Sequence, residues 1–129
     1  MTPRELLLNG AQKLGIVLTV EQINSVFIYL AELKKWSQKI NLTAIKDERD
    51  IIIKHVLDSL SYIHGFIPAP GQQLLDMGSG AGFPALPLKI ACPGIVVTMV
   101  ESTKKKASFL RHIIRTLKLT ETVVIDSRT

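Results

Sequence analysis

The sequence predicts an α/β fold in which N-terminal helices precede the first half of a Rossmann-like domain with three parallel strands. In the first half of the chain, apolar residues recur at the spacing of amphipathic helices. In the second half, three short apolar runs alternate with helix-like segments, a pattern typical of parallel strands joined by helices. A glycine-rich turn follows the first of these runs, the position at which such folds bind nucleotides.

The first two helices carry recognisable start signals. We expect a helix over residues 3–14, because Thr2 can cap it and Pro3 is tolerated in a first helical turn. Thr19 and Gln22 have the spacing of a capping box at the start of the next helix. This helix should run to about Trp36 and bury the stripe formed by Ile23, Val26, Phe27, Leu30 and Leu33. Trp36 continues that stripe, which favours a core anchor over a platform for base stacking.

A third helix is expected to begin near Asp47, after a connector. His55 and Asp58 are three positions apart within it and so share one face. They could form an acid–base pair, or a local hydrogen bond that fixes this helix against the glycine-rich turn. We favour the second interpretation. No group of histidine, cysteine or acidic residues has the spacing of metal ligands, so we expect no metal.

Glycine and proline residues between positions 65 and 71 end the helical pattern. They predict a helical region over residues 1–66 and a partial Rossmann-like domain over residues 67–129. The second part should contain strands at 73–77, 95–101 and 122–126 and helices at 82–91 and 103–117.

The turn after the first strand has the composition of a ligand-binding loop. Gly78 and Gly80 allow the backbone to turn tightly and to approach a ligand without an intervening Cβ. Glu101, at the end of the second strand, follows Gly82 by 19 positions. That is close to the spacing of roughly 20 residues at which an acid reaches a ribose hydroxyl. The pattern favours a site for a nucleotide-like cofactor over a glycine-rich turn that binds nothing.

Phe83 discriminates between cofactors. A dinucleotide fingerprint would require glycine at that position. A bulky apolar residue suits a cofactor without a pyrophosphate, such as S-adenosylmethionine, and argues against the alternative of an NAD-linked oxidoreductase. Asp76, at the end of the first strand, could orient the loop or meet the amino group of the cofactor. We give these two roles equal weight.

The charge balance favours polyanionic partners. The formal net charge is +5, and basic residues gather in two groups, each of which could instead be a solvated helix face. The larger group lies in the expected helix at 103–117 and just after it, and the smaller lies near Trp36: Lys104, Lys105, Lys106, Arg111, Arg115 and Lys118, and Lys34, Lys35 and Lys39.

Other features bound the location of the protein. No apolar run is long enough to span a membrane, and the first residues lack the layout of a signal peptide. Cys92 is the single cysteine, so no internal disulfide can form, and we expect it to be a buried apolar residue. We therefore expect a cytoplasmic protein.

The segment DMGSGAGFPALPLK at residues 76–89 resembles the loop of the bacterial small-subunit rRNA guanine-N7 methyltransferases, the family once called glucose-inhibited division protein B. The resemblance continues upstream in WSQKINLT at 36–43 and KHVLDS at 54–59, and downstream in ESTKKK at 101–106. One departure is Ala85, where members usually carry glycine.

The resemblance implies a class I methyltransferase fold that uses S-adenosylmethionine to methylate N7 of a guanine in 16S rRNA of the small ribosomal subunit. It implies cofactor contacts by Gly78, Gly80, Phe83 and Glu101, and by the backbone at Thr129. It names no catalytic acid or base, and the catalytic residues stay unknown.

Three strands are fewer than a doubly wound fold needs, because its ligand crevice lies where the strand order reverses. We therefore expect the chain to be the N-terminal part of a longer enzyme, inactive alone, with an unpaired edge on the first strand. A non-catalytic module that binds RNA or the ribosome is the second alternative. Arg128 could contact RNA phosphate or be an ordinary surface residue.

Overall fold

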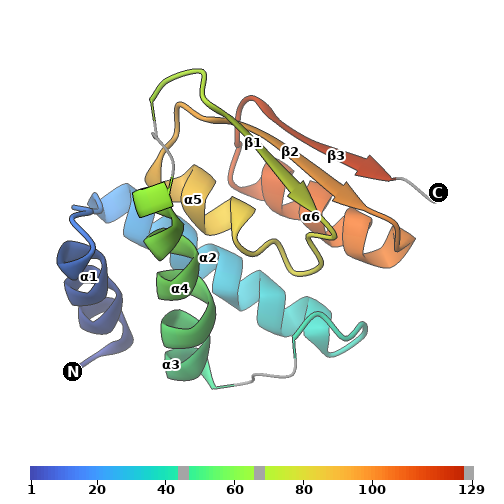
Figure 1. Ribbon diagram of the computed structural model, residues 1–129. Helices are drawn as coiled ribbons and strands as arrows, with labels where there is room; N and C mark the ends of the chain where they lie inside the picture. The colour runs from blue at the N-terminus through green and yellow to red at the C-terminus, as the bar shows by residue number, and fades with distance from the viewer. Residues whose placement is uncertain (44–46, 66–68, 127–129) are drawn as a thin grey trace.

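A computed structural model describes residues 1–43, 47–65 and 69–126. Its sheet consists of β1 (Gln73–Met77), β2 (Val96–Glu101) and β3 (Thr122–Asp126), which are parallel and lie in the order β1-β2-β3 (Figure 1). The predicted α/β class with three parallel strands is confirmed. The parallel pairing brings the carboxyl ends of all three strands to the same edge of the sheet.

The helices between the strands are α5 (Ala85–Ala91) and α6 (Lys104–Thr116). α5 begins three residues later than predicted. The reason is local: Gly82 has φ +97°, which cannot continue into a right-handed helix, and Pro84 is the first residue that can cap one. Residues 80–84 therefore belong to the loop after β1 and not to a helix.

The N-terminal helices begin at the predicted caps. α1 (Pro3–Lys13) and α2 (Val20–Ser37) both start with capping boxes, formed by Thr2 with Glu5 and by Thr19 with Gln22. In each box the threonine hydroxyl accepts a hydrogen bond from the backbone N–H three residues later, at 3.1 Å. These contacts satisfy backbone donors that have no partner within the helix.

The third helical segment is less regular than its sequence suggested. It starts after Asp47 as predicted, and then passes through α3 (Glu48–Ile51), a π-helical turn η1 (Ile52–Leu57), α4 (Asp58–Leu60) and a 3₁₀ turn η2 (Ser61–Gly65). Apolar spacing does not distinguish an i→i+5 turn from an α-helix, so the π-helical turn could not be predicted.

The elements form three layers (Figure 1). The sheet is one layer, α5 and α6 pack against one of its faces, and the N-terminal helices pack behind them. One hydrophobic core runs through all three layers; it includes Val97, Met99, Leu86, Leu88, Leu30 and Leu33. The expected boundary between residues 66 and 67 lies outside the described residues, and the division into two domains stays a prediction.

The other face of the sheet is apolar and exposed. Four residues on it are about half to two-thirds exposed: Leu75 (63%), Met77 (68%), Val123 (54%) and Ile125 (48%). Within the described part of the chain β1 pairs only with β2, so its outer edge is free, as expected. Parallel sheets usually bury both faces. None of the helices among the described residues has the length and apolar character needed to cross a membrane.

Candidate functional site

The loop over residues 78–84 lies where β1 and β2 end side by side. Met77 and Val100 are register partners, and the Gly78 N–H donates to the Val100 carbonyl at 2.7 Å. The loop therefore starts at the carboxyl edge of the sheet, the edge at which open α/β sheets bind their ligands.

Gly78 and Gly80 leave open space in front of this loop. Their φ angles are +71° and +56°, in the left-handed region that side chains rarely tolerate. A Cβ added at Gly78 would meet no atom within 4 Å, and one at Gly80 would meet only the Gly78 carbonyl oxygen, at 4.0 Å. Both residues thus expose bare backbone, as a loop that cradles a ligand requires.

Glu101 joins this loop to the end of β2. Its Oε1 accepts a hydrogen bond from the Gly80 N–H at 2.8 Å, and its Oε2 accepts one from the Thr103 N–H at 2.9 Å. Burial favours a raised pKa for Glu101, but these two donors, together with the charge of Lys106, outweigh burial and lower it. The side chain is therefore an ionised carboxylate, 6% exposed, at the predicted position beside the glycine loop.

Asp76 supports the same loop from below. It is buried, and its Oδ2 accepts a hydrogen bond from the Ala85 N–H at 3.3 Å, at the start of α5. The pKa of Asp76 is raised, chiefly by burial and further by the nearby charge of Glu101. Hydrogen bonds from Ala85 and Ser79 oppose this rise but do not outweigh it. Of the two roles expected for Asp76, the loop-capping contact is present.

The remaining predicted residues differ in where they lie. The Phe83 ring packs toward the N-terminal helices, between Tyr29 and His55. The Asp58 backbone N–H donates to the His55 carbonyl within the helical segment, and among the described residues no hydrogen bond joins the two side chains. His55 instead stacks on Phe83, so this helical segment does pack on the loop. Arg128 and Thr129 lie outside the described residues.

Among the described residues, neither a reactive thiol nor a metal-binding group adds a second candidate site. Cys92 is a buried free thiol whose pKa is raised by burial, which disfavours the thiolate, as expected for an inert apolar residue. Among the described residues, no three His, Cys, Asp or Glu side chains are grouped so that they could hold a metal ion.

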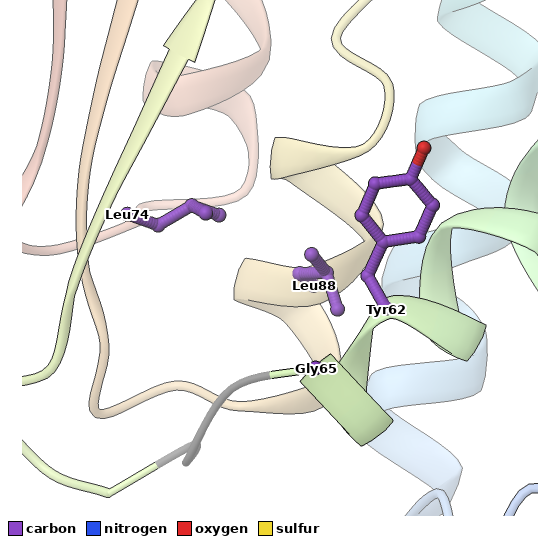
Figure 2. A pocket seen from close by; sticks show the side chains of 4 residues that line it. All are labelled: Tyr62, Gly65, Leu74 and Leu88. Carbon is purple, nitrogen blue, oxygen red and sulfur yellow. The ribbon is translucent and has the colours of Figure 1, made fainter.

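A small hollow of about 220 Å³ lies at the other end of β1 (Figure 2). Leu74, Leu88, Gly65 and Tyr62 line it, and Figure 2 shows the two leucine side chains extending into the space between β1, α5 and the end of the third helical segment. Leu74 is near the start of β1, four residues before the loop, which is about 13 Å at a rise of about 3.3 Å per residue. None of the described residues that line the hollow is charged, and none of them belongs to the glycine loop.

Sequence reasoning missed Tyr29. It lies on the buried face of α2 but was not part of the predicted stripe, and its hydroxyl donates to the Ala81 carbonyl of the loop at 2.5 Å. The available signal was a hydroxyl at a core position, since a buried hydroxyl requires a partner.

Comparison with known proteins places this arrangement in context. A family model described as rRNA small subunit methyltransferase G matches residues 22–129. The ribosomal RNA small subunit methyltransferase G of Alkaliphilus oremlandii is 44% identical over 128 residues, which are 99% of this chain and 54% of that protein. The protein of the same name from Roseiflexus sp. (strain RS-1) is 48% identical over 124 residues, 96% of this chain and 53% of that protein. The chain spans about half the length of the curated relatives it matches.

Proposed function

Because the chain belongs to the rRNA small subunit methyltransferase G family, we propose that a protein of the relatives' full length carrying this sequence methylates N7 of a guanine in 16S rRNA. The observation that carries this proposal is the bond between loop and acid: the Gly80 N–H donates to Glu101, at the shared edge of β1 and β2. The glycine loop, the acid and the family membership support the proposal that the cofactor is S-adenosylmethionine.

The residues present fit that cofactor. Gly78 offers open backbone beside the strand end, where an amino-acid moiety can approach. Glu101 has an ionised carboxylate whose two oxygens each retain acceptor capacity beyond the bond they already make, so a ribose hydroxyl can still donate to it. Phe83 is partly exposed although its ring contacts Tyr29 and His55, and it is proposed to line the pocket. Bound S-adenosylmethionine supplies an activated methyl group on a sulfonium.

Methyl transfer to guanine N7 does not require a catalytic acid or base. Guanine N7 has a lone pair and no proton to remove, so its attack on the methyl group needs no general base. The protein's contribution is to hold N7 in line with the bond that breaks, an effect with a ceiling of roughly 7–11 kcal/mol. We accordingly assign no catalytic acid or base.

The arrangement of α2 and α6 suggests where RNA binds. α2 and α6 pack together and run in opposite directions (Figure 1). Glu32 pairs with His112 across this contact, and the Trp36 and Phe109 ring centroids are 5.6 Å apart. The C-terminal end of α2 therefore lies beside the N-terminal end of α6, which directly follows Glu101. This brings the exposed basic residues of both groups to the edge of the sheet that carries the candidate site: Lys34, Lys35, Lys39, Lys104 and Lys105. We propose that they contact the phosphates of 16S rRNA, which would place the protein in the cytoplasm with the ribosome.

Methyl transfer tests the proposal. The protein to assay is a full-length fusion in which this chain replaces the matched 54% of the Alkaliphilus oremlandii relative. It should transfer a labelled methyl group from S-adenosylmethionine to small ribosomal subunits that lack the modification, and nuclease digestion should release N7-methylguanosine. Label in another nucleoside would refute the N7 assignment.

The net charge of +5 also suits a module that binds RNA without catalysis. Binding of ribosomal subunits by the fusion without methyl transfer, while the unmodified relative is active in parallel, would favour that second function. Family membership argues against the NAD-linked alternative.

A further inference from the structure

Tyr29, which is far from the glycine loop in the sequence, forms a hydrogen bond to the backbone of that loop. Tyr29, on α2, has no exposed surface, and its hydroxyl donates to the Ala81 carbonyl at 2.5 Å. This contact links residues 52 positions apart. A buried hydroxyl without a partner is costly, so the bond both pays for the burial of Tyr29 and fixes the carbonyl of Ala81.

Phe83 contacts two of the N-terminal helical segments. Its ring lies against Tyr29, with centroids 5.6 Å apart. It also stacks on the imidazole of His55 in η1, with centroids 4.7 Å apart and ring planes inclined by 15°. The loop residue is therefore anchored to two helical segments that come before the sheet in the chain.

Gly82 shows how closely the loop fits this support. A Cβ built there would lie 2.4 Å from Leu86 Cδ1 and 3.0 Å from the Tyr29 hydroxyl oxygen. Gly78 differs from Gly82, because a Cβ built at Gly78 would face open space. The loop therefore has two different sides. One side is packed against α2, and the other is free for a ligand.

We propose that Tyr29 is a positioning residue, which holds the glycine loop through the Ala81 carbonyl in the conformation that the cofactor meets. The N-terminal helices are then the rigid back of the cofactor site in addition to being part of the core. A loop held in its binding shape beforehand spares the ligand the entropy cost of ordering it. The identity of the ligand rests on the proposed function. The positioning of the loop by Tyr29 does not depend on that proposal.

Hydrogen exchange in the 129-residue chain tests the hold on the loop. The Gly82 N–H donates to the Ser79 carbonyl and the Gly80 N–H donates to Glu101, so both amides report the loop conformation. Tyr29→Phe keeps the ring and removes the hydroxyl. We expect these two amides to exchange at least about tenfold faster relative to the Met99 amide in the central strand, which reports global stability.

Tyr62→Phe is the matched control, because Tyr62 is 52% exposed and lines the hollow near the start of β1. It should leave all three exchange rates unchanged. Equal acceleration of loop and sheet amides in Tyr29→Phe would overturn the proposal and make Tyr29 an ordinary core residue. If Tyr29→Phe does not fold, Phe83→Leu weakens the ring contact between the loop and Tyr29 and is judged by the same ratio of exchange rates.

The affinity for S-adenosylmethionine tests whether the positioning of the loop by Tyr29 affects cofactor binding. In the full-length fusion, Tyr29→Phe should raise the Kd for S-adenosylmethionine about tenfold, while Tyr62→Phe leaves it unchanged. An unchanged Kd in a fusion whose loop has loosened would overturn the positioning role. No binding by the unsubstituted fusion would count against the proposed function, and the exchange ratio would still decide whether Tyr29 holds the loop.

Discussion

Replacing Glu101 by alanine should weaken both the fold and the site. The substitution removes the acceptors of two hydrogen bonds, from the Gly80 and Thr103 N–H groups, at 2.8 and 2.9 Å. Hydrogen bonds to a charged group are each worth about 1.5–3 kcal/mol. Gly80 is only half-buried, so water can replace part of this loss. We therefore expect the free energy of unfolding of the 129-residue chain to fall by about 2–4 kcal/mol at pH 7.

The effect should depend on pH in a defined direction. The folded-state pKa of Glu101 lies below its ordinary value of 4.5, so the carboxylate stabilises the fold fully above that pH. This contribution is lost as the pH falls through the folded-state pKa. The stability difference between the original chain and Glu101→Ala should therefore shrink below about pH 4.5.

Urea denaturation at a series of pH values measures both quantities. Asp126→Ala is the control, because Asp126 is an exposed acid and the register partner of Glu101 on β3. It should change stability by no more than about 0.5 kcal/mol. Two results would refute the account of this carboxylate. One is that Glu101→Ala lowers the free energy of unfolding by no more than Asp126→Ala does. The other is that the stability difference between the original chain and Glu101→Ala stays constant down to pH 3.

Three further outcomes are expected. Reversing Lys104 and Lys105, both exposed, to glutamate in the full-length fusion should weaken RNA binding and flatten its salt dependence while sparing cofactor affinity; equal salt slopes would mean an ordinary solvated helix face. Gly82→Ala should lower the melting temperature of the chain, because the new Cβ meets Leu86 and Tyr29 and the φ is +97°; an unchanged melting temperature would contradict the tight fit. The chain should self-associate at high concentration through the free edge and apolar face of β1, as light scattering would show, and Met77→Lys should reduce this; a monomer throughout would mean that the surface is not adhesive.

Much of the fold was predictable because local signals agreed with the tertiary structure. β1 and β3 have the predicted bounds, since their short apolar runs are flanked by turn residues. The capping threonines Thr2 and Thr19 marked two helix starts. The π-helical turn η1 was not predictable, because the apolar stripe that it presents is also compatible with an α-helix.

The site was predictable in its outline and not in its support. Glycine spacing and an acid at the next strand end identified the face that a ligand would meet, and the structure brings Gly80 and Glu101 into contact. Tyr29 was missed because the predicted apolar stripe of α2 did not include it, and periodicity in any case does not say which atom of a buried residue needs a partner. Its contact with Ala81 depends on how α2 packs against the loop, which only the folded chain determines.

Calorimetric titration of the full-length fusion tests the central claim most directly, since that claim is that the glycine loop and Glu101 bind S-adenosylmethionine. S-adenosylmethionine should bind at one site, NAD should give no heat of binding, and Glu101→Ala should weaken S-adenosylmethionine binding by at least about tenfold. Binding of NAD, or equal affinity for S-adenosylmethionine with and without the Glu101 carboxylate, would contradict it.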